Sequence, residues 1–259
     1  MSLSETTLVV MTKFPQAGRV KTRLMPALSG EQAAATHEAF LVHLCGRLAR
    51  MEWGRRVICH DPPDCGPALR ALVGRAFEYL PQGGGDLGAR MAAAAVASSA
   101  AARTGDPGGA LLFIGVDSPD VPTAALAAAA RLVKTHDVVL GPSADGGYWS
   151  VALARRVDPV ALLSRIEWSS GRELDQTLER ARALGYNVAR ADAWPDVDYP
   201  PDLRRLVARL RASDDPADGA LLGRLLAVLP ARSVLLDDHD DDNAAGEGNA
   251  GADEDERDV

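Results

Sequence analysis

The amino-acid sequence predicts an α/β domain with a mostly parallel central sheet. Short apolar, β-branched segments alternate along the chain with segments whose apolar residues recur at helical spacing. The run at residues 110–116 (ALLFIGV) is apolar throughout, which is typical of a strand buried on both faces of a parallel sheet. No linker-like segment or internal repeat interrupts this alternation before residue 237. We therefore expect one folded domain.

The apolar runs place the expected strands at residues 7–12, 55–60, 77–81, 110–116, 137–141, 148–154 and 186–190. Helices are expected where apolar side chains return every three or four residues, or where alanine dominates: residues 31–52, 87–103, 123–135, 172–184 and 203–210. In an open α/β sheet, ligands bind beyond the carboxyl ends of the strands. The loops that follow the strands are therefore where chemistry should be sought.

The charge of the chain is unevenly distributed. The net charge of the 259 residues is −8, but residues 237–259 alone contain eleven acidic residues and one arginine, with almost no large apolar side chains. Such a segment cannot repay its ordering entropy, so we expect a domain over residues 1–236 and a disordered acidic tail over residues 237–259. The near-neutral body has no basic face with interleaved aromatic residues, which argues against nucleic acid as a partner. We recognise neither a secretory signal nor a membrane span, so the cytoplasm is the expected location.

The first candidate loop is basic and follows the first expected strand directly. Within residues 12–24 (TKFPQAGRVKTRL) it carries four cations and two residues that shape the turn, namely Lys13, Arg19, Lys21 and Arg23, with Pro15 and Gly18. Four cations at the carboxyl end of a strand suit phosphate oxygens. The loop has neither the GxxxxGK[ST] pattern of a Walker loop nor the GxGxxG of dinucleotide sites. A solvated basic loop without a ligand is the equally simple alternative.

Two acidic residues follow the strand that the sequence predicts to be the most buried. Asp117 and Asp120 come directly after residues 110–116, and burying a carboxylate is costly unless a cation meets it. Asp120 is well placed to cap the helix expected from Pro122, whereas Asp117 comes too early for that role. Hard oxygen ligands beside a phosphate-suited loop indicate Mg²⁺ or Mn²⁺ bound together with a substrate diphosphate. Asp117 is therefore the stronger metal candidate of the two.

The turn at residues 141–149 (GPSADGGYW) is the third candidate. Asp145, Gly146 and Gly147 form a turn signature that a simple hairpin would also explain. Turn chemistry does not require the aromatic pair that follows, Tyr148 and Trp149. We therefore expect these two side chains to form one wall of a pocket.

Two further loops carry acids ahead of helical runs. In residues 194–203 (WPDVDYPPDL), Asp202 is placed to cap a helix, but Asp198 has no evident local role and could supply a second metal carboxylate. In residues 83–91 (GGGDLGARM), Asp86 precedes a helix, where it either caps that helix or lies beside a nucleotide.

The motifs in these loops, taken in order, resemble those of a known family of bacterial transferases. The matching segments are TKFPQAGRVKTRL, GDLGARM, FIGVDSPDVP, GPSADGGYW, IEWSSGRELDQT and DVDYPPDL, spread over residues 7 to about 207. The sequence is similar to the glycosyltransferase-A-like (GT-A) proteins labelled radical-SAM/selenodomain-associated transferase 1 or arsenosugar-biosynthesis glycosyltransferases. These belong to the nucleotide-diphospho-sugar transferase superfamily, whose members include the phospholactate and molybdenum-cofactor guanylyltransferases.

This resemblance implies a Rossmann-like, three-layer α/β/α domain that binds a nucleoside diphosphate sugar or a nucleoside triphosphate with Mg²⁺ or Mn²⁺. By position, it implies that Asp117, Asp198 and Asp120 hold the metal, with Asp117 the strongest of the three. Phosphates would be contacted by Lys13, Lys21 and Arg23, and the acceptor would be faced by Asp145 and Tyr148. The wider set expected to bind substrate or nucleotide comprises Pro15, Gly18, Arg19, Asp86, Gly146 and Gly147.

The sequence also departs from the patterns of its relatives. DSPD has one more residue between its acids than DxD, Tyr199 replaces a threonine, and the GGxSxRMG loop of the guanylyltransferases is absent. We therefore predict a metal-dependent glycosyltransferase that moves a sugar to a small-molecule acceptor, with Asp117 on the metal and Asp145 as the base for the acceptor hydroxyl. The alternatives are a nucleotidyltransferase that releases pyrophosphate and a non-catalytic nucleotide-binding protein.

Overall fold

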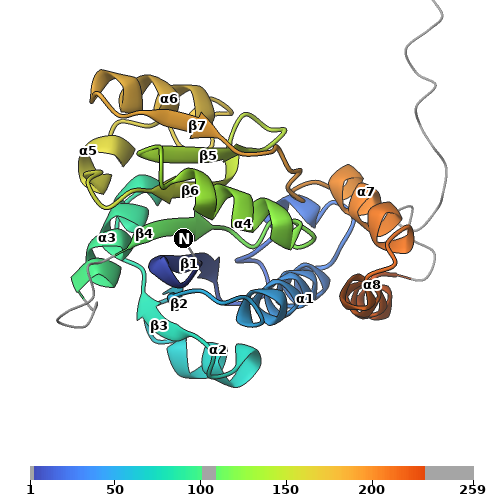
Figure 1. Cartoon of the computed structure of the whole chain (residues 1–259). Coiled ribbons are helices and arrows are strands. Elements are labelled where there is room, and N and C mark those ends of the chain that lie inside the picture. Colours follow the sequence, from blue (N-terminus) through green and yellow to red (C-terminus); the bar gives the residue numbers. More distant parts are fainter. Residues whose placement is uncertain (1–2, 101–108, 231–259) are drawn as a thin grey trace, which may run out of the picture.

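A seven-stranded sheet runs through the part of the chain that the computed structural model describes, residues 3–100 and 109–230 (Figure 1). The strands are β1 (Thr6–Lys13), β2 (Arg55–Asp61), β3 (Glu78–Pro81), β4 (Ala110–Ile114), β5 (Val138–Pro142), β6 (Tyr148–Leu153) and β7 (Val188–Arg190). Their order across the sheet is β3-β2-β1-β4-β6-β5-β7, and among these strands β6 alone runs antiparallel to its neighbours. The predicted α/β class with a mostly parallel sheet is confirmed. The expected acidic tail, residues 237–259, lies outside the described residues.

Helices cover both faces of this sheet. They are α1 (Gly30–Ala49), α2 (Gly66–Val73), α3 (Leu87–Ala100), α4 (Thr123–Leu132), α5 (Pro159–Leu163), α6 (Glu173–Ala183), α7 (Pro200–Arg211) and α8 (Pro216–Val228), with short 3₁₀ turns η1 (Leu3–Glu5) and η2 (Thr22–Leu24). Helices α1, α2 and α4 pack in one apolar cluster, and α3, α5 and α6 pack in another. None of the described helices combines the length and apolar character needed to cross a bilayer.

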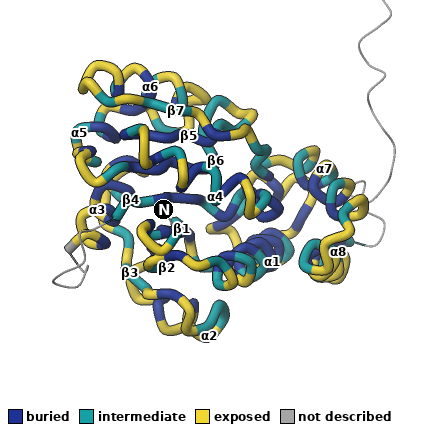
Figure 2. The backbone as a smooth tube through the Cα atoms, viewed as in Figure 1, coloured by how far each residue is buried: buried dark blue, intermediate teal, exposed yellow. Residues whose placement is uncertain are grey.

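Strand alternation explains the two clusters. Leu8 and Val10 of β1 join the α1 side, while Val9 between them joins the α3 side, because successive side chains of a strand point to opposite faces. All three are fully buried, and Figure 2 shows the central strands buried while the outer faces of the helices are exposed. Burial on both faces is what the continuous apolar runs of the sequence indicate.

A third apolar cluster holds α7 and α8 against α1 and the segment around η2. It joins Leu206 and Leu210 of α7 and Leu221 and Leu225 of α8 to Phe40 of α1. Helix α8 begins in a way that the sequence encodes locally. The Asp215 side chain accepts a hydrogen bond from the Ala217 backbone N–H (2.8 Å), and Pro216 occupies the first helical position.

The connections bring four segments to the carboxyl edge of the sheet. Strands β1 and β4 are parallel neighbours, so the loops that leave them lie side by side at this edge. Strand β5 ends and β6 begins at this same edge, joined by the turn at residues 143–147. The segment after β7 returns over the edge, where the Val197 backbone N–H donates to the Asp117 carbonyl (2.9 Å).

Candidate functional site

A cleft of about 900 Å³ lies at this carboxyl edge. It is lined by the loop after β1, the start of α3, the loop after β4, the β5–β6 turn, the segment before α6 and the segment after β7. Its volume is in the range of sites for nucleotides and other small molecules. The cleft thus lies among the loops that follow the strands, where the sequence predicts the functional site.

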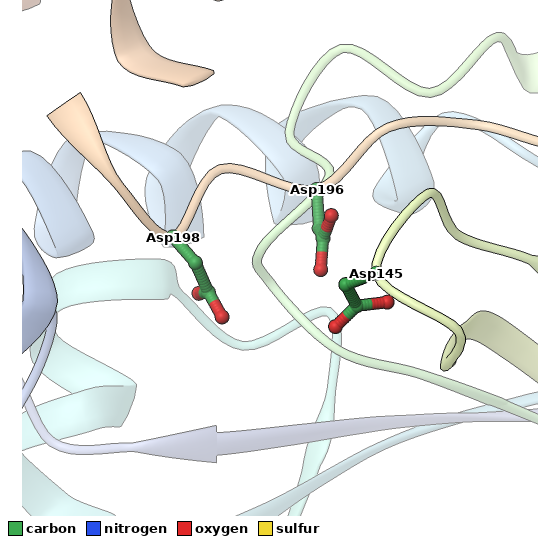
Figure 3. A group of neighbouring side chains, drawn as sticks. All are labelled: Asp145, Asp196 and Asp198. Atoms are coloured by element: carbon green, nitrogen blue, oxygen red, sulfur yellow. The ribbon is translucent and has the colours of Figure 1, made fainter. Parts of the chain in front are cut away.

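Three carboxylates converge in the cleft, and we name them the carboxylate triad: Asp145, Asp196 and Asp198. Each offers an oxygen within 4.8 Å of the other two, and Figure 3 shows the three side chains directed toward a common space. Asp145 comes from the β5–β6 turn, and the other two come from the segment after β7. Three hard oxygen donors that leave other directions open suit Mg²⁺ or Mn²⁺ with water or phosphate as further ligands.

Asp145 is held in place by its own turn. Its Oδ1 accepts hydrogen bonds from the Ser143 hydroxyl and from the Gly147 backbone N–H (2.9 Å). Gly146, between them, has φ of +86°, and a Cβ there would lie 2.0 Å from the Gly171 carbonyl oxygen. Only glycine fits, because both the left-handed backbone and the close approach exclude a side chain. The turn is therefore a hairpin, as the simpler interpretation of the sequence predicts, and this hairpin also directs the Asp145 carboxylate into the cleft.

Asp196 was not among the residues expected from the sequence. Burial, and then the negative charge of Asp145, raise the pKa of Asp196 to about 6, with a smaller contribution from Asp198. A carboxyl group whose charge is disfavoured by neighbouring acids gains most from a bound cation. In the sequence, Asp196 stands next to Pro195 in an irregular segment, and nothing local distinguishes it from a turn residue.

Lys21 contacts one member of the triad, Asp198. Its Nζ contacts the Asp117 carboxylate, the Val197 carbonyl oxygen (2.5 Å) and Asp198 Oδ1 (3.4 Å), and its side chain is 3% exposed. Burial alone would raise the pKa of Asp117, but the charge and hydrogen bond of Lys21 hold that pKa below its usual value. The Asp117 side chain is nevertheless about half exposed toward the cleft, at 48%.

The remaining cations of the basic loop face the cleft more openly. Arg23 Nη1 donates to Asp198 Oδ2 (2.8 Å), and the guanidinium lies over the Tyr199 ring at 5.4 Å from its centroid. Lys13 and Arg19 are exposed and line the cleft. Arg90, at the start of α3, also lines the cleft and had not been expected. Pro15 and Gly18 shape the loop without lining the cleft, and Gly18 has φ of +73°.

Asp120 lies apart from the triad. Its side chain, 5% exposed, pairs with Arg209 of α7 (Nε to Oδ2, 2.7 Å) and accepts a hydrogen bond from Trp194 Nε1 (3.2 Å). It does not line the cleft. Asp120 therefore fixes α7 to the loop after β4 and is not a ligand of the proposed metal site.

The structure also locates Asp86 and the aromatic pair, Tyr148 and Trp149, in the lining of the cleft. Asp86 lines the cleft and caps α3, where its Oδ1 accepts from the Ala89 backbone N–H (2.8 Å). Tyr148 and Trp149 both line the cleft, although they also pack into different apolar clusters. Tyr148 meets Trp168, a further lining residue, edge to face, with ring centroids 6.3 Å apart.

The comparisons with known proteins agree with this fold. The model of a family described as an uncharacterized protein conserved in bacteria (DUF2064) matches residues 44–170. No curated protein sequence matches the chain. A solved structure of a candidate nucleotide-diphospho-sugar transferase from Desulfovibrio desulfuricans G20 is 27% identical, with a TM-score of 0.76, and the match covers 88% of this chain and 97% of that one.

Two more distant structures share the fold alone. A homologue of Mycobacterium tuberculosis Rv0371c, from Mycobacterium sp. strain JC1, is 17% identical over 81% of this chain and 99% of that one, with a TM-score of 0.51. The 4-diphosphocytidyl-2C-methyl-D-erythritol synthase of Anaerococcus prevotii DSM 20548 is 12% identical over 80% and 98%, with a TM-score of 0.50. The chain therefore has the fold of the nucleotide-diphospho-sugar transferases.

Proposed function

We propose that this chain transfers a glycosyl group from a nucleoside diphosphate sugar to a small-molecule acceptor, with Mg²⁺ or Mn²⁺ held by the carboxylate triad. The observation that carries the proposal is the convergence of Asp145, Asp196 and Asp198 beside a basic loop, within one cleft. The order of the sequence motifs supports it. So does the similarity to a structure described as a candidate nucleotide-diphospho-sugar transferase.

The donor set fits a divalent cation. Three carboxylates that face one another repel unless a cation stands between them, and oxygen ligands are those that Mg²⁺ and Mn²⁺ prefer. When bound, the cation neutralises charge that develops on the diphosphate as the glycosyl bond breaks. Compared with the set expected from the sequence, Asp198 is retained because its carboxylate lies with those of Asp145 and Asp196, although it also pairs with Lys21 and Arg23. Asp117 and Asp120 lie outside this group and pair with Lys21 and Arg209.

Cations and acids both line the cleft. The loop after β1 and the start of α3 bring Lys13, Arg19 and Arg90, and the β5–β6 turn brings Asp145 and leads to the Tyr148–Trp168 corner. We place the diphosphate of the donor between these cations and the triad, since fixed positive groups stabilise developing negative charge. The aromatic corner suits the apolar face of a sugar or of the acceptor.

Two roles are open to Asp145 in the proposed reaction. The sequence predicts it as the base for the acceptor hydroxyl, while its place in the triad makes it a cation ligand. A carboxylate that coordinates a cation is less basic, because the positive charge favours its ionised form. We therefore assign Asp145 to the cation. Asp145→Asn separates the two roles, since a ligand loss weakens Mn²⁺ binding and a base loss slows transfer alone.

The experiment is a product assay. The protein is incubated with a panel of nucleoside diphosphate sugars and Mn²⁺, and nucleoside diphosphate is measured, first as slow hydrolysis without acceptor. We expect release that EDTA abolishes and that Asp198→Asn lowers on the order of 100-fold. Asp192→Asn, an exposed change in the same segment, is the matched control and should behave as wild type.

Parallel incubations with nucleoside triphosphates test the nucleotidyl alternative. Pyrophosphate release from a triphosphate, with no turnover of any nucleotide sugar, would replace glycosyl by nucleotidyl transfer. Nucleotide binding without turnover of either class of donor would leave a non-catalytic binding protein.

A further inference from the structure

The surroundings of the Lys21 ammonium are those of a bound cation. Its Nζ is surrounded by oxygens from two other segments: the Asp117 carboxylate, Asp198 Oδ1 at 3.4 Å and the Val197 carbonyl at 2.5 Å. The Phe40 ring lies on a further side, with its centroid 5.7 Å from Nζ. Two carboxylates and a carbonyl are also a ligand set that a divalent cation takes.

The backbone holds Lys21 in this position. The residue has left-handed dihedral angles, φ 47° and ψ 36°, which are uncommon for a side chain other than glycine or asparagine. Its flanking residues Val20 and Leu24 are buried, and the Leu24 backbone N–H donates to the Lys21 carbonyl (2.9 Å). A strained conformation persists only where the surrounding structure enforces it. The ammonium is therefore a fixed part of the site.

Asp198 joins this ammonium to the carboxylate triad. One of its oxygens contacts Lys21, the other accepts from Arg23, and the residue is also a member of the triad. Asp117 and Asp198 pair with Lys21 and Arg23, whereas Asp145 and Asp196 have no ion pair among the described residues. The charge of these two acids equals, with opposite sign, that of one divalent ion.

We infer that Lys21 is a built-in cation that takes the place of a second divalent ion between Asp117 and Asp198. The inference rests on the proposed cation site of the triad. Two-metal sites place their ions about 3.5–4 Å apart and bridge them with shared carboxylates. Here Asp198 is the shared carboxylate, Lys21 occupies one position, and the triad offers the other to a single exchangeable Mg²⁺ or Mn²⁺. Lys21 is thus a positioning residue that sets the number of metal ions.

The test counts Mn²⁺ ions per chain by calorimetry and by electron paramagnetic resonance, without nucleotide. We expect one ion in the wild type and two in Lys21→Met, because removal of the ammonium frees the Asp117–Asp198 pair. Lys13→Met removes the same charge from the same loop at an exposed position and should still bind one. The double variant Lys21→Met with Asp117→Asn should return to one.

Thermal melting gives a second readout. Lys21→Met should melt below the wild type in EDTA, because Asp117 and Asp198 lose the ammonium between them. Mn²⁺ should raise its melting temperature by more than it raises that of the wild type. If Lys21→Met does not fold, Lys21→Gln, which keeps a donor for the Val197 carbonyl, replaces it in both measurements.

The outcomes separate this inference from the proposed function. One ion in both the wild type and the Lys21 variant, with equal thermal response to Mn²⁺, would overturn the inference and leave the triad intact. No ion in the wild type but one in the variant would support Lys21 as a cation substitute and reject the triad. No ion in either would reject both.

Discussion

Arg209 of α7 and Asp120 of the loop after β4 form a two-point ion pair, with Nε to Oδ2 at 2.7 Å and Nη2 to Oδ1 at 3.3 Å. Together with the contact of Lys21 to Asp117, it explains why β4 is followed by two acids. Each carboxylate meets a cation from a distant part of the chain. One pair fastens α7 to the sheet, and the other lies at the floor of the cleft.

Asp120→Asn should therefore act on stability and leave metal binding unchanged. The substitution keeps the volume of the side chain but leaves Arg209 without its partner, which we expect to lower the free energy of unfolding by about 2 kcal/mol, below the cost of a fully buried pair because Arg209 is partly exposed. Urea unfolding measures the first effect and Mn²⁺ titration the second. Unchanged stability with weakened Mn²⁺ binding would restore Asp120 to the metal site.

Asp196→Asn tests the member of the triad that the sequence did not reveal. Removal of one of three carboxylates should weaken Mn²⁺ binding by roughly tenfold or more, because even outer-shell partners of a metal cost that much. Asp192→Asn, in the same segment but exposed and away from the cleft, is the control. Equal Mn²⁺ affinities in the two variants would remove Asp196 from the cation site.

Gly146→Ala should displace the β5–β6 turn. An added Cβ would lie 2.0 Å from the Gly171 carbonyl oxygen, at a φ of +86°, so the turn must shift and carry Asp145 with it. We expect a lower melting temperature and weaker Mn²⁺ binding. Gly219→Ala is the matched control, since that glycine lies within α8 with open space around it, and alanine should stabilise the helix by about 0.5–1 kcal/mol. A Gly146→Ala protein with wild-type melting and Mn²⁺ affinity would contradict the clamped turn.

His43 gives the fold a defined dependence on pH. Its Nε2 lies 3.5 Å from Asp218 Oδ1, at the contact of α1 with α8, and its side chain is 5% exposed. Burial, and then the charge of Arg47, lower the pKa of His43 to about 4, from 6.5 for an unperturbed histidine. The unfolded chain therefore binds a proton that the folded chain does not between pH 6.5 and pH 4.

Stability should consequently fall as the pH drops through this window, with His43 contributing on the order of 2–3 kcal/mol of the loss. Urea unfolding of the wild type and of His43→Gln at several pH values checks this. The variant should lose less stability than the wild type between pH 6.5 and pH 4. Parallel curves would show that His43 titrates alike in the folded and unfolded chains.

Much of the fold could be predicted because the strands are encoded locally. Every expected strand is present within a few residues of its predicted bounds. The central strands are the easiest to predict, since a strand buried on both faces is apolar along its length. Helices α2 and α5 were not predicted because they are short. The longer α8 was also missed, although its start signal, Asp215 followed by Pro216, was readable. Its packing against α1 and α7 depends on contacts far apart in the sequence.

The site was less predictable for the same reason. The sequence indicates Asp117 and Asp198 as acids without sufficient local roles, and Asp145 through the motif that it shares with the resembled family, but it does not show which of them meet. Lys21 reaches Asp117 across 96 positions and Asp198 across 177, and such pairings depend on the order of the strands in the sheet. Asp196 joins the triad through the path of the chain after β7, which no local pattern specifies.

The reversed direction of β6 has a consequence for how this protein can diversify. Because β6 carries the chain away from the cleft, residues 154–172 must travel back to bring Gly171 against Gly146. That excursion, with α5 and Trp168, supplies one wall of the cleft but no member of the triad. Outside Gly171, which clamps the turn that carries Asp145, its length and composition can therefore change while the triad keeps its place. Under the proposed function, we expect an exchange of this excursion between relatives to change which acceptor the cleft selects.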